Sequence, residues 1–275
     1  MKKTKKKAAA PRARKSAKAA PAKSRIPDLK LAQGVDGLRQ AIGILRDQSQ
    51  SLPNRTEALH ILQSATFGDE NFDAVRGDYT AALRELTEDK ETMLRQRALG
   101  LLARSRDPYA EKVLVSGLQD PQKAAVPAGD ALHYLSYNAH SGVQSLARSI
   151  FDKSKDNTVR QQALRLMAND PKSLQTIRDT LADKKEAVEV RQTSAEALHA
   201  LDPKALQTWA SNAVLDKKEN EDVVATSLTA LRHFGDEKQI SGNTKLRKRL
   251  AEISSGEGPA KVKRLAKTIT TKYGL

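Results

Sequence analysis

Small and apolar residues recur along this chain with the spacing of an amphipathic helix. Two segments show the pattern most clearly, each beginning at a valine that follows an aspartate by seven residues: Val159 after Asp152 and Val190 after Asp183. Small or apolar residues then occupy the positions four, five, seven and eight residues after each valine. Because these offsets fall on one side of a helix with about 3.6 residues per turn, the pattern predicts helices that each bury one stripe.

The predicted helix is repeated along the chain. Residues 57–62 (EALHIL) return as 130–135 (DALHYL) and as 196–201 (EALHAL). Alignment of the segments gives one apolar column, with steps of 43, 30, 35, 31 and 33 residues: Leu59, Leu102, Leu132, Met167, Leu198 and Leu231. Repeat periods of about 20 to 50 residues are typical of solenoids and related arrays.

Aspartate–proline pairs mark several predicted helix starts. They occur at Asp107-Pro108, Asp120-Pro121, Asp170-Pro171 and Asp202-Pro203. Aspartate caps the first turn of a helix, and proline fits that turn because its missing N–H has no partner there. We therefore expect each repeat to be a helix, a short turn and a second helix.

The strings that follow Val159 (VRQQA) and Val190 (VRQTSAEAL), each after a turn aspartate, resemble HEAT repeats of the armadillo-like class over roughly residues 30 to 240. The resemblance implies an all-α fold, a right-handed α-solenoid of about six to seven helix pairs. It also implies that second helices line a concave face and that Arg95, Arg160 and Arg191 bond turn aspartates. Val224 and Ala125 depart from this arginine position, which predicts a break in that ladder at two repeats.

Charge divides the chain into three segments. Residues 1–25 hold eleven basic and no acidic residues, residues 26–242 hold 28 basic and 31 acidic, and residues 243–275 hold nine basic and two acidic. We therefore expect a basic tail over 1–25, a repeat array over 26–242 and a basic C-terminal capping unit over 243–275. The repeat array itself carries no excess of positive charge.

The first 25 residues have the composition of a disordered tail, because alanine is their main apolar residue and Pro11 and Pro21 interrupt any helix. They resemble the Lys-, Ala- and Pro-rich tails of linker histones, which bind phosphate backbones by charge. The candidate nucleic-acid contacts here are Lys2, Lys3, Lys5, Lys6, Lys7, Arg12, Arg14, Lys15 and Lys18. A solubilising or targeting extension is the alternative interpretation.

The C-terminal segment is also rich in basic residues, which lie on predicted helices. Its candidate nucleic-acid contacts are Arg247, Lys248, Lys263 and Arg264. The alternative is a plain capping unit, because the end of a repeat array needs a polar outer face.

A polar aromatic cluster and a tryptophan complete the candidate contact residues. His133, Tyr134, Tyr137 and His140 form a run suited to partner contacts, with ordinary packing at a helix end as the alternative. Trp209 aligns with Ile177 of the preceding repeat, which predicts a place in the core.

Signals for catalysis and metal binding are few. His60, His133 and His199 share one repeat position, but a full repeat separates each from the next, so no shared ion is expected. Metal-binding hydroxylases of the HEAT-like class use His-Glu pairs, and no histidine here is followed by glutamate. Cysteine is absent, and no apolar stretch approaches the length of a membrane span. We expect no catalytic residues, no metal and no cofactor.

Three classes of function fit these patterns. The favoured expectation is a non-catalytic scaffold that binds a protein partner on its concave face. The second is a nucleic-acid-associated adaptor that holds DNA or RNA through its basic ends. The third is an enzyme such as a DNA glycosylase or a bilin lyase. A cytoplasmic location is expected, with association to a nucleoid or to chromatin left open, and no membrane contact.

Overall fold

The computed structural model describes residues 28–275, and the candidate contacts within residues 1–25 lie outside this part of the chain. The chain divides into two compact units, Met1–Phe72 and Asp73–Leu275. In the first unit, α1 (Gly34–Arg46) packs against α2 (Leu52–Ala65). The boundary between the units falls inside the segment 26–242, at the 3-10 helix η1 (Phe72–Val75).

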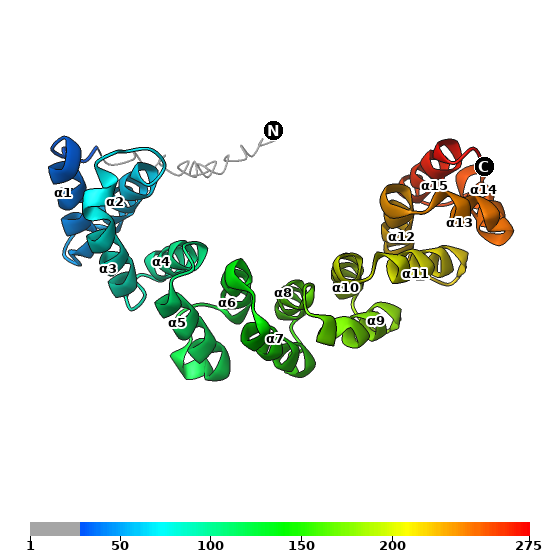
Figure 1. Ribbon diagram of the computed structural model, residues 1–275, viewed down its shortest axis with the longest axis horizontal. Helices are drawn as coiled ribbons and strands as arrows, with labels where there is room; N and C mark the ends of the chain where they lie inside the picture. Colours follow the sequence, from blue (N-terminus) through cyan, green and yellow to red (C-terminus); the bar gives the residue numbers. More distant parts are fainter. Residues whose placement is uncertain (1–27) are drawn as a thin grey trace, which may run out of the picture. The chain divides into compact units, whose positions relative to one another are not determined.

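The second unit is a succession of helix pairs (Figure 1). The pairs are α3 (Arg76–Leu86) with α4 (Thr92–Arg104), α5 (Pro108–Gln119) with α6 (Ala128–Leu135), α7 (Ser141–Lys153) with α8 (Asn157–Met167), α9 (Leu174–Ala182) with α10 (Val188–Leu201), α11 (Pro203–Leu215) with α12 (Glu221–Phe234), and α14 (Thr244–Ser255) with α15 (Ala260–Lys272). The 3-10 helix η2 (Pro121–Lys123) lies within the pair of α5 and α6. The short elements between pairs are the 3-10 helices η3 (Ser136–Asn138) and η4 (Pro171–Ser173) and the helix α13 (Glu237–Gly242).

Second helices of successive pairs contact one another, because α4 packs on α6, α6 on α8, α8 on α10, and α10 on α12. Residues 28–275 contain helices and no strand. The expected fold class, an all-α solenoid of helix pairs, is confirmed.

The core follows the predicted column. All six of its side chains are at most 1% exposed: Leu59, Leu102, Leu132, Met167, Leu198 and Leu231. The apolar column read from the sequence therefore lies in the core. Trp209 is a correction, because it is half-buried while the neighbouring Ala210 is fully buried.

The aspartates of the Asp-Pro pairs act as the predicted caps. Asp107 accepts a hydrogen bond from the backbone N–H of Tyr109 at 2.9 Å, and Asp202 accepts one from Ala205 at 2.9 Å. Asp120 and Asp170 cap the two 3-10 helices η2 and η4 in the same way. Three of these caps also join successive helix pairs, since Arg84 bonds Asp107, Arg148 bonds Asp170 and Arg178 bonds Asp202.

Candidate nucleic-acid interface

The first basic surface lies on α14. Asn243 caps this helix, accepting a hydrogen bond from the backbone N–H of Leu246 at 3.0 Å. Leu246 and Leu250 are buried one turn apart and hold one side of α14 against the preceding helices. The basic residues Lys245, Arg247 and Lys248 are exposed. The helix therefore buries its leucines and presents its cations to solvent.

The second basic surface lies on α15. Val262, Ala266 and Ile269 are buried, and α15 packs on α12. The hydroxyl of Tyr273 donates to the carbonyl of Leu231 at 3.0 Å, which fixes the C-terminal end of α15. The exposed basic residues of the helix are Lys261, Arg264, Lys267 and Lys272.

The four predicted C-terminal contacts are thus placed on two packed helices. Arg247, Lys248 and Arg264 are exposed, whereas Lys263 is half-buried. None of the four side chains forms an ion pair with another residue of the part that the structure describes. The neighbouring Arg249 differs, because its Nε donates to the carbonyl of Val214 at 3.1 Å and it serves the packing.

A groove adjoins α15 and is bordered mainly by the second helices α10 and α12. Its volume is about 460 Å³, and its lining residues are Gln192, Ala195, Glu196, His199, Leu206, Ala225, Thr226, Thr229, Ala230, Phe234 and Lys261. The rings of His199 and Phe234 stack within it, with centroids 3.7 Å apart and planes 24° apart. Phe234 is nevertheless 53% exposed. No sequence pattern marks this groove, because its lining residues come from four helices, α10, α11, α12 and α15.

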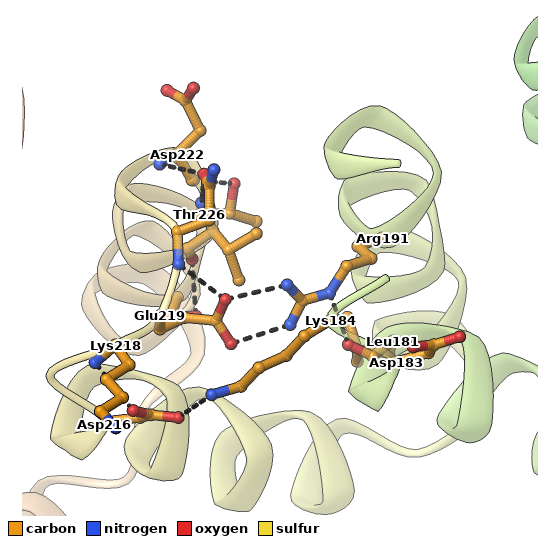
Figure 2. A network of polar contacts seen from close by, with 12 residues as sticks. Leu181, Asp183, Lys184, Arg191, Asp216, Lys218, Glu219, Asp222 and Thr226 are labelled. Carbon is orange, nitrogen blue, oxygen red and sulfur yellow. Dashed lines mark hydrogen bonds and ion pairs between the residues drawn. The ribbon is translucent and has the colours of Figure 1, made fainter. Parts of the chain in front are cut away.

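The two helices that border the groove are joined by a polar network (Figure 2). The guanidinium of Arg191 donates two hydrogen bonds of 2.9 Å to the carboxylate of Glu219, in the turn before α12. The amide of Gln192 donates to the hydroxyl of Thr226 at 2.9 Å. Lys184 forms a further ion pair with Asp216. These bonds join α10 and the turn before it to α12 and the turn that precedes α12.

The network also sets the ionisation of its carboxylates. The hydrogen bonds from Arg191 hold the pKa of Glu219 below its ordinary value, against the opposing effect of burial. The hydrogen bond from Lys184 lowers the pKa of Asp216. Both groups are therefore ionised at neutral pH and offset the cations that they bind.

The arginines of the expected ladder bond other partners than the turn aspartates that were expected. Arg160 and Arg191 bond the glutamates Glu186 and Glu219 of the next turn rather than aspartates. Arg95 donates instead to backbone carbonyls, that of Asp89 at 2.6 Å among them. Both arginine–glutamate pairs join one helix pair to the next.

Three residues of the predicted polar aromatic run lie close together: His133, Tyr134 and Tyr137. The hydroxyl of Tyr137 lies 3.1 Å from Nε2 of His133, and the rings of His133 and Tyr134 lie 5.9 Å apart. Burial, reinforced by Asp130, raises the pKa of Tyr134. His140 is separate from these rings in its bonding, since its Nε2 lies 2.9 Å from the carboxylate of Glu111. Partner contact by these four residues stays a prediction.

Residues 28–275 form no group of three or more His, Cys, Asp or Glu side chains suited to a metal ion. No helix among these residues combines the length and the apolar character that a membrane span requires.

Comparison with known proteins gives a likeness in structure and none in sequence family. No protein-family model matches the chain, and no curated protein matches its sequence. The fold is similar to the solved structure of human deoxyhypusine hydroxylase in complex with glycerol, with 14% sequence identity and a TM-score of 0.38. The likeness covers 87% of this chain and 96% of that chain.

This comparison corrects the favoured expectation from the sequence. A non-catalytic scaffold that holds a protein partner was expected, whereas the similar structure is that of an enzyme. The scaffold function is therefore withdrawn. At this identity and TM-score the likeness assigns no reaction to the present chain, and the absence of a catalytic constellation stays a prediction.

Proposed function

We propose that this protein binds the phosphate backbones of nucleic acids through α14 and α15, with the basic segment 1–25 as a second contact. The observation that supports the proposal is the set of exposed cations Arg247, Lys248 and Arg264, which have no carboxylate partner among the described residues. Arginines of the preceding helix pairs, such as Arg148, Arg178 and Arg191, are instead bonded to carboxylates.

Unpaired cations on packed helices suit a polyanion for a simple reason. A cation already bonded to a carboxylate must give up that bond before it contacts a phosphate, whereas a solvated one exchanges only water and counterions. Release of counterions from the nucleic acid then drives the association, and it gives binding that depends on salt and not on base sequence. The excess of nine basic over two acidic residues in 243–275 adds long-range attraction.

The experiment is a titration of a labelled duplex by fluorescence anisotropy at several salt concentrations. The test variant replaces the four predicted contacts: Arg247→Gln, Lys248→Gln, Lys263→Gln and Arg264→Gln. The control variant makes the same change of charge on exposed lysines of the repeat array: Lys153→Gln, Lys155→Gln, Lys172→Gln and Lys204→Gln.

The slope of log affinity against log salt should fall in magnitude by about 0.9 for each phosphate contact that the test variant loses. The control variant should keep nearly the full slope, because its lysines lie away from the proposed surface. Equal losses in the two variants would show that net charge matters and the helix pair does not. No binding of the full chain at low salt would remove the proposal.

A further inference from the structure

Phe234 offers an aromatic face that the fold does not use. One side of its ring stacks on His199, yet 53% of the residue is exposed at the end of α12. The groove beside the ring has a volume of about 460 Å³, within the range of about 300 to 1,000 Å³ that ligand sites occupy.

The floor and the rim of the groove differ in character. Ala195, Ala225 and Ala230 are buried and form a flat apolar floor between α10 and α12. The charged side chains among the lining residues are Glu196 and Lys261, both exposed. A phosphate inside the groove would be repelled by the carboxylate of Glu196, whereas a flat uncharged ring would meet the apolar floor and the exposed ring of Phe234.

The cation at the rim belongs to the proposed phosphate-binding surface. Lys261 stands in the first turn of α15, and Arg264 and Lys267 follow it at intervals of three residues on the exposed side of that helix. The buried residues of α15 lie on the opposite side, against α12. A strand whose phosphates follow these three cations therefore passes the mouth of the groove.

We infer that this groove receives an unstacked nucleobase of a single-stranded nucleic acid, with Phe234 as the stacking platform and Lys261 as the adjacent phosphate contact. The inference rests on the proposed function and adds the form of nucleic acid that the surface prefers. Bases of a duplex are stacked on one another and paired, so they cannot enter, whereas bases of a single strand are free to turn onto an aromatic side chain. Stacking of this kind tolerates any base, because each base has a π face.

The inference is tested with three probes of equal length on the full chain: a single strand of mixed sequence, an abasic strand with the same phosphates, and a duplex. Phe234→Leu removes the aromatic ring and keeps an apolar side chain. Phe67→Leu is the matched control, because Phe67 is the other large exposed apolar residue of the described part and is 85% exposed. Lys261→Gln tests the adjacent phosphate contact.

We expect the chain to bind the base-bearing strand more tightly than the abasic strand. Phe234→Leu should weaken binding of the base-bearing strand by about tenfold, within the range that one stacked base supplies, and leave the abasic strand and the duplex unchanged. Lys261→Gln should weaken both single strands alike, and Phe67→Leu should change no affinity. Circular dichroism establishes that each variant is folded.

Two results would overturn the inference and separate it from the proposed function. If the chain binds all three probes and Phe234→Leu weakens none of them, or all of them equally, the groove takes no base and the phosphate surface stands. If the full chain binds no probe at low salt, the proposed function fails and the base site fails with it.

Discussion

Arg191 and Glu219 form a bidentate ion pair between successive helix pairs. Both hydrogen bonds are 2.9 Å long, and both side chains are at most 5% exposed. The same guanidinium donates through Nε to the carbonyl of Leu181 at 3.0 Å. One side chain therefore satisfies the end of α9 and also fixes the turn that precedes α12 (Figure 2). The bond thereby adds to the packing that positions α12, which borders the groove beside Phe234.

Replacing the acid of this pair should destabilise the protein strongly. In Glu219→Gln the guanidinium of Arg191 stays buried without a counter-charge, and loss of one partner of a buried pair costs on the order of 3 to 5 kcal/mol. Urea denaturation monitored by circular dichroism measures the change in the free energy of unfolding. The control is Glu221→Gln, an exposed glutamate two residues away, which should change that free energy by less than about 0.5 kcal/mol.

The same pair predicts how stability depends on acid. Arg191 holds the pKa of Glu219 below its ordinary value, so the folded state favours the ionised carboxylate. Its stabilising effect is present above the unfolded-state pKa of about 4.3 and is lost as the pH falls through the lowered folded-state value. Melting temperatures measured between neutral pH and pH 3 should decline less steeply in Glu219→Gln than in the unmodified chain. Parallel curves would contradict this assignment.

The core column predicts a contrast between two neighbouring residues. Leu198 is 1% exposed, and its truncation to alanine leaves a cavity that costs on the order of 2 to 5 kcal/mol. His199 is half-buried at the edge of the groove, so His199→Ala should cost far less. Thermal unfolding of the two variants checks the register, and equal small shifts in melting temperature would show that it is wrong.

Burial raises the pKa of Tyr79 to about 12. Because the folded state favours the neutral phenol, its contribution to stability is complete below the unfolded-state pKa of about 10 and is lost as the pH rises through the folded-state value. Tyr79→Phe cannot ionise, so its free energy of unfolding should fall less between pH 9 and pH 11 than that of the unmodified chain. Denaturant unfolding at these pH values makes the measurement, and an identical decline would exclude Tyr79 as a source of alkaline sensitivity.

Deleting residues 1–25 should distinguish the contributions that the two basic ends make to nucleic-acid binding. We expect the deletion to reduce the magnitude of the salt slope for duplex binding by about 0.9 for each phosphate contact that the eleven cations supply. The helical circular dichroism and the melting temperature should stay unchanged, since the sequence predicts no core residues in this segment. Retention of the full slope would place the contact on α14 and α15 alone.

The sequence by itself determined the repeated helix, its buried stripe and its caps. Leu198 and Leu231 could be placed in the core because a stripe at helical spacing has to face the neighbouring helices, whatever their exact arrangement. Asp107 and Asp202 could be identified as caps because a cap bonds backbone groups only two or three residues away. The excess of cations in 243–275 was likewise visible, and three of the four chosen contacts are exposed.

Only the tertiary structure decided which side chains meet across repeats and which apolar residues stay in solvent. Glu219 lies 28 residues from Arg191, and its selection over the turn aspartate Asp216 depends on how one helix pair is offset from the next. Phe234 stands three residues after Leu231, as the buried Leu135 stands after Leu132, so repeat alignment would place it in the core. It is nevertheless 53% exposed, although Leu135 also ends its helix, because the neighbouring elements leave much of the Phe234 ring uncovered. Local periodicity indicates which side of a helix faces its partner within a pair. The contacts across repeats depend instead on how one pair packs on the next.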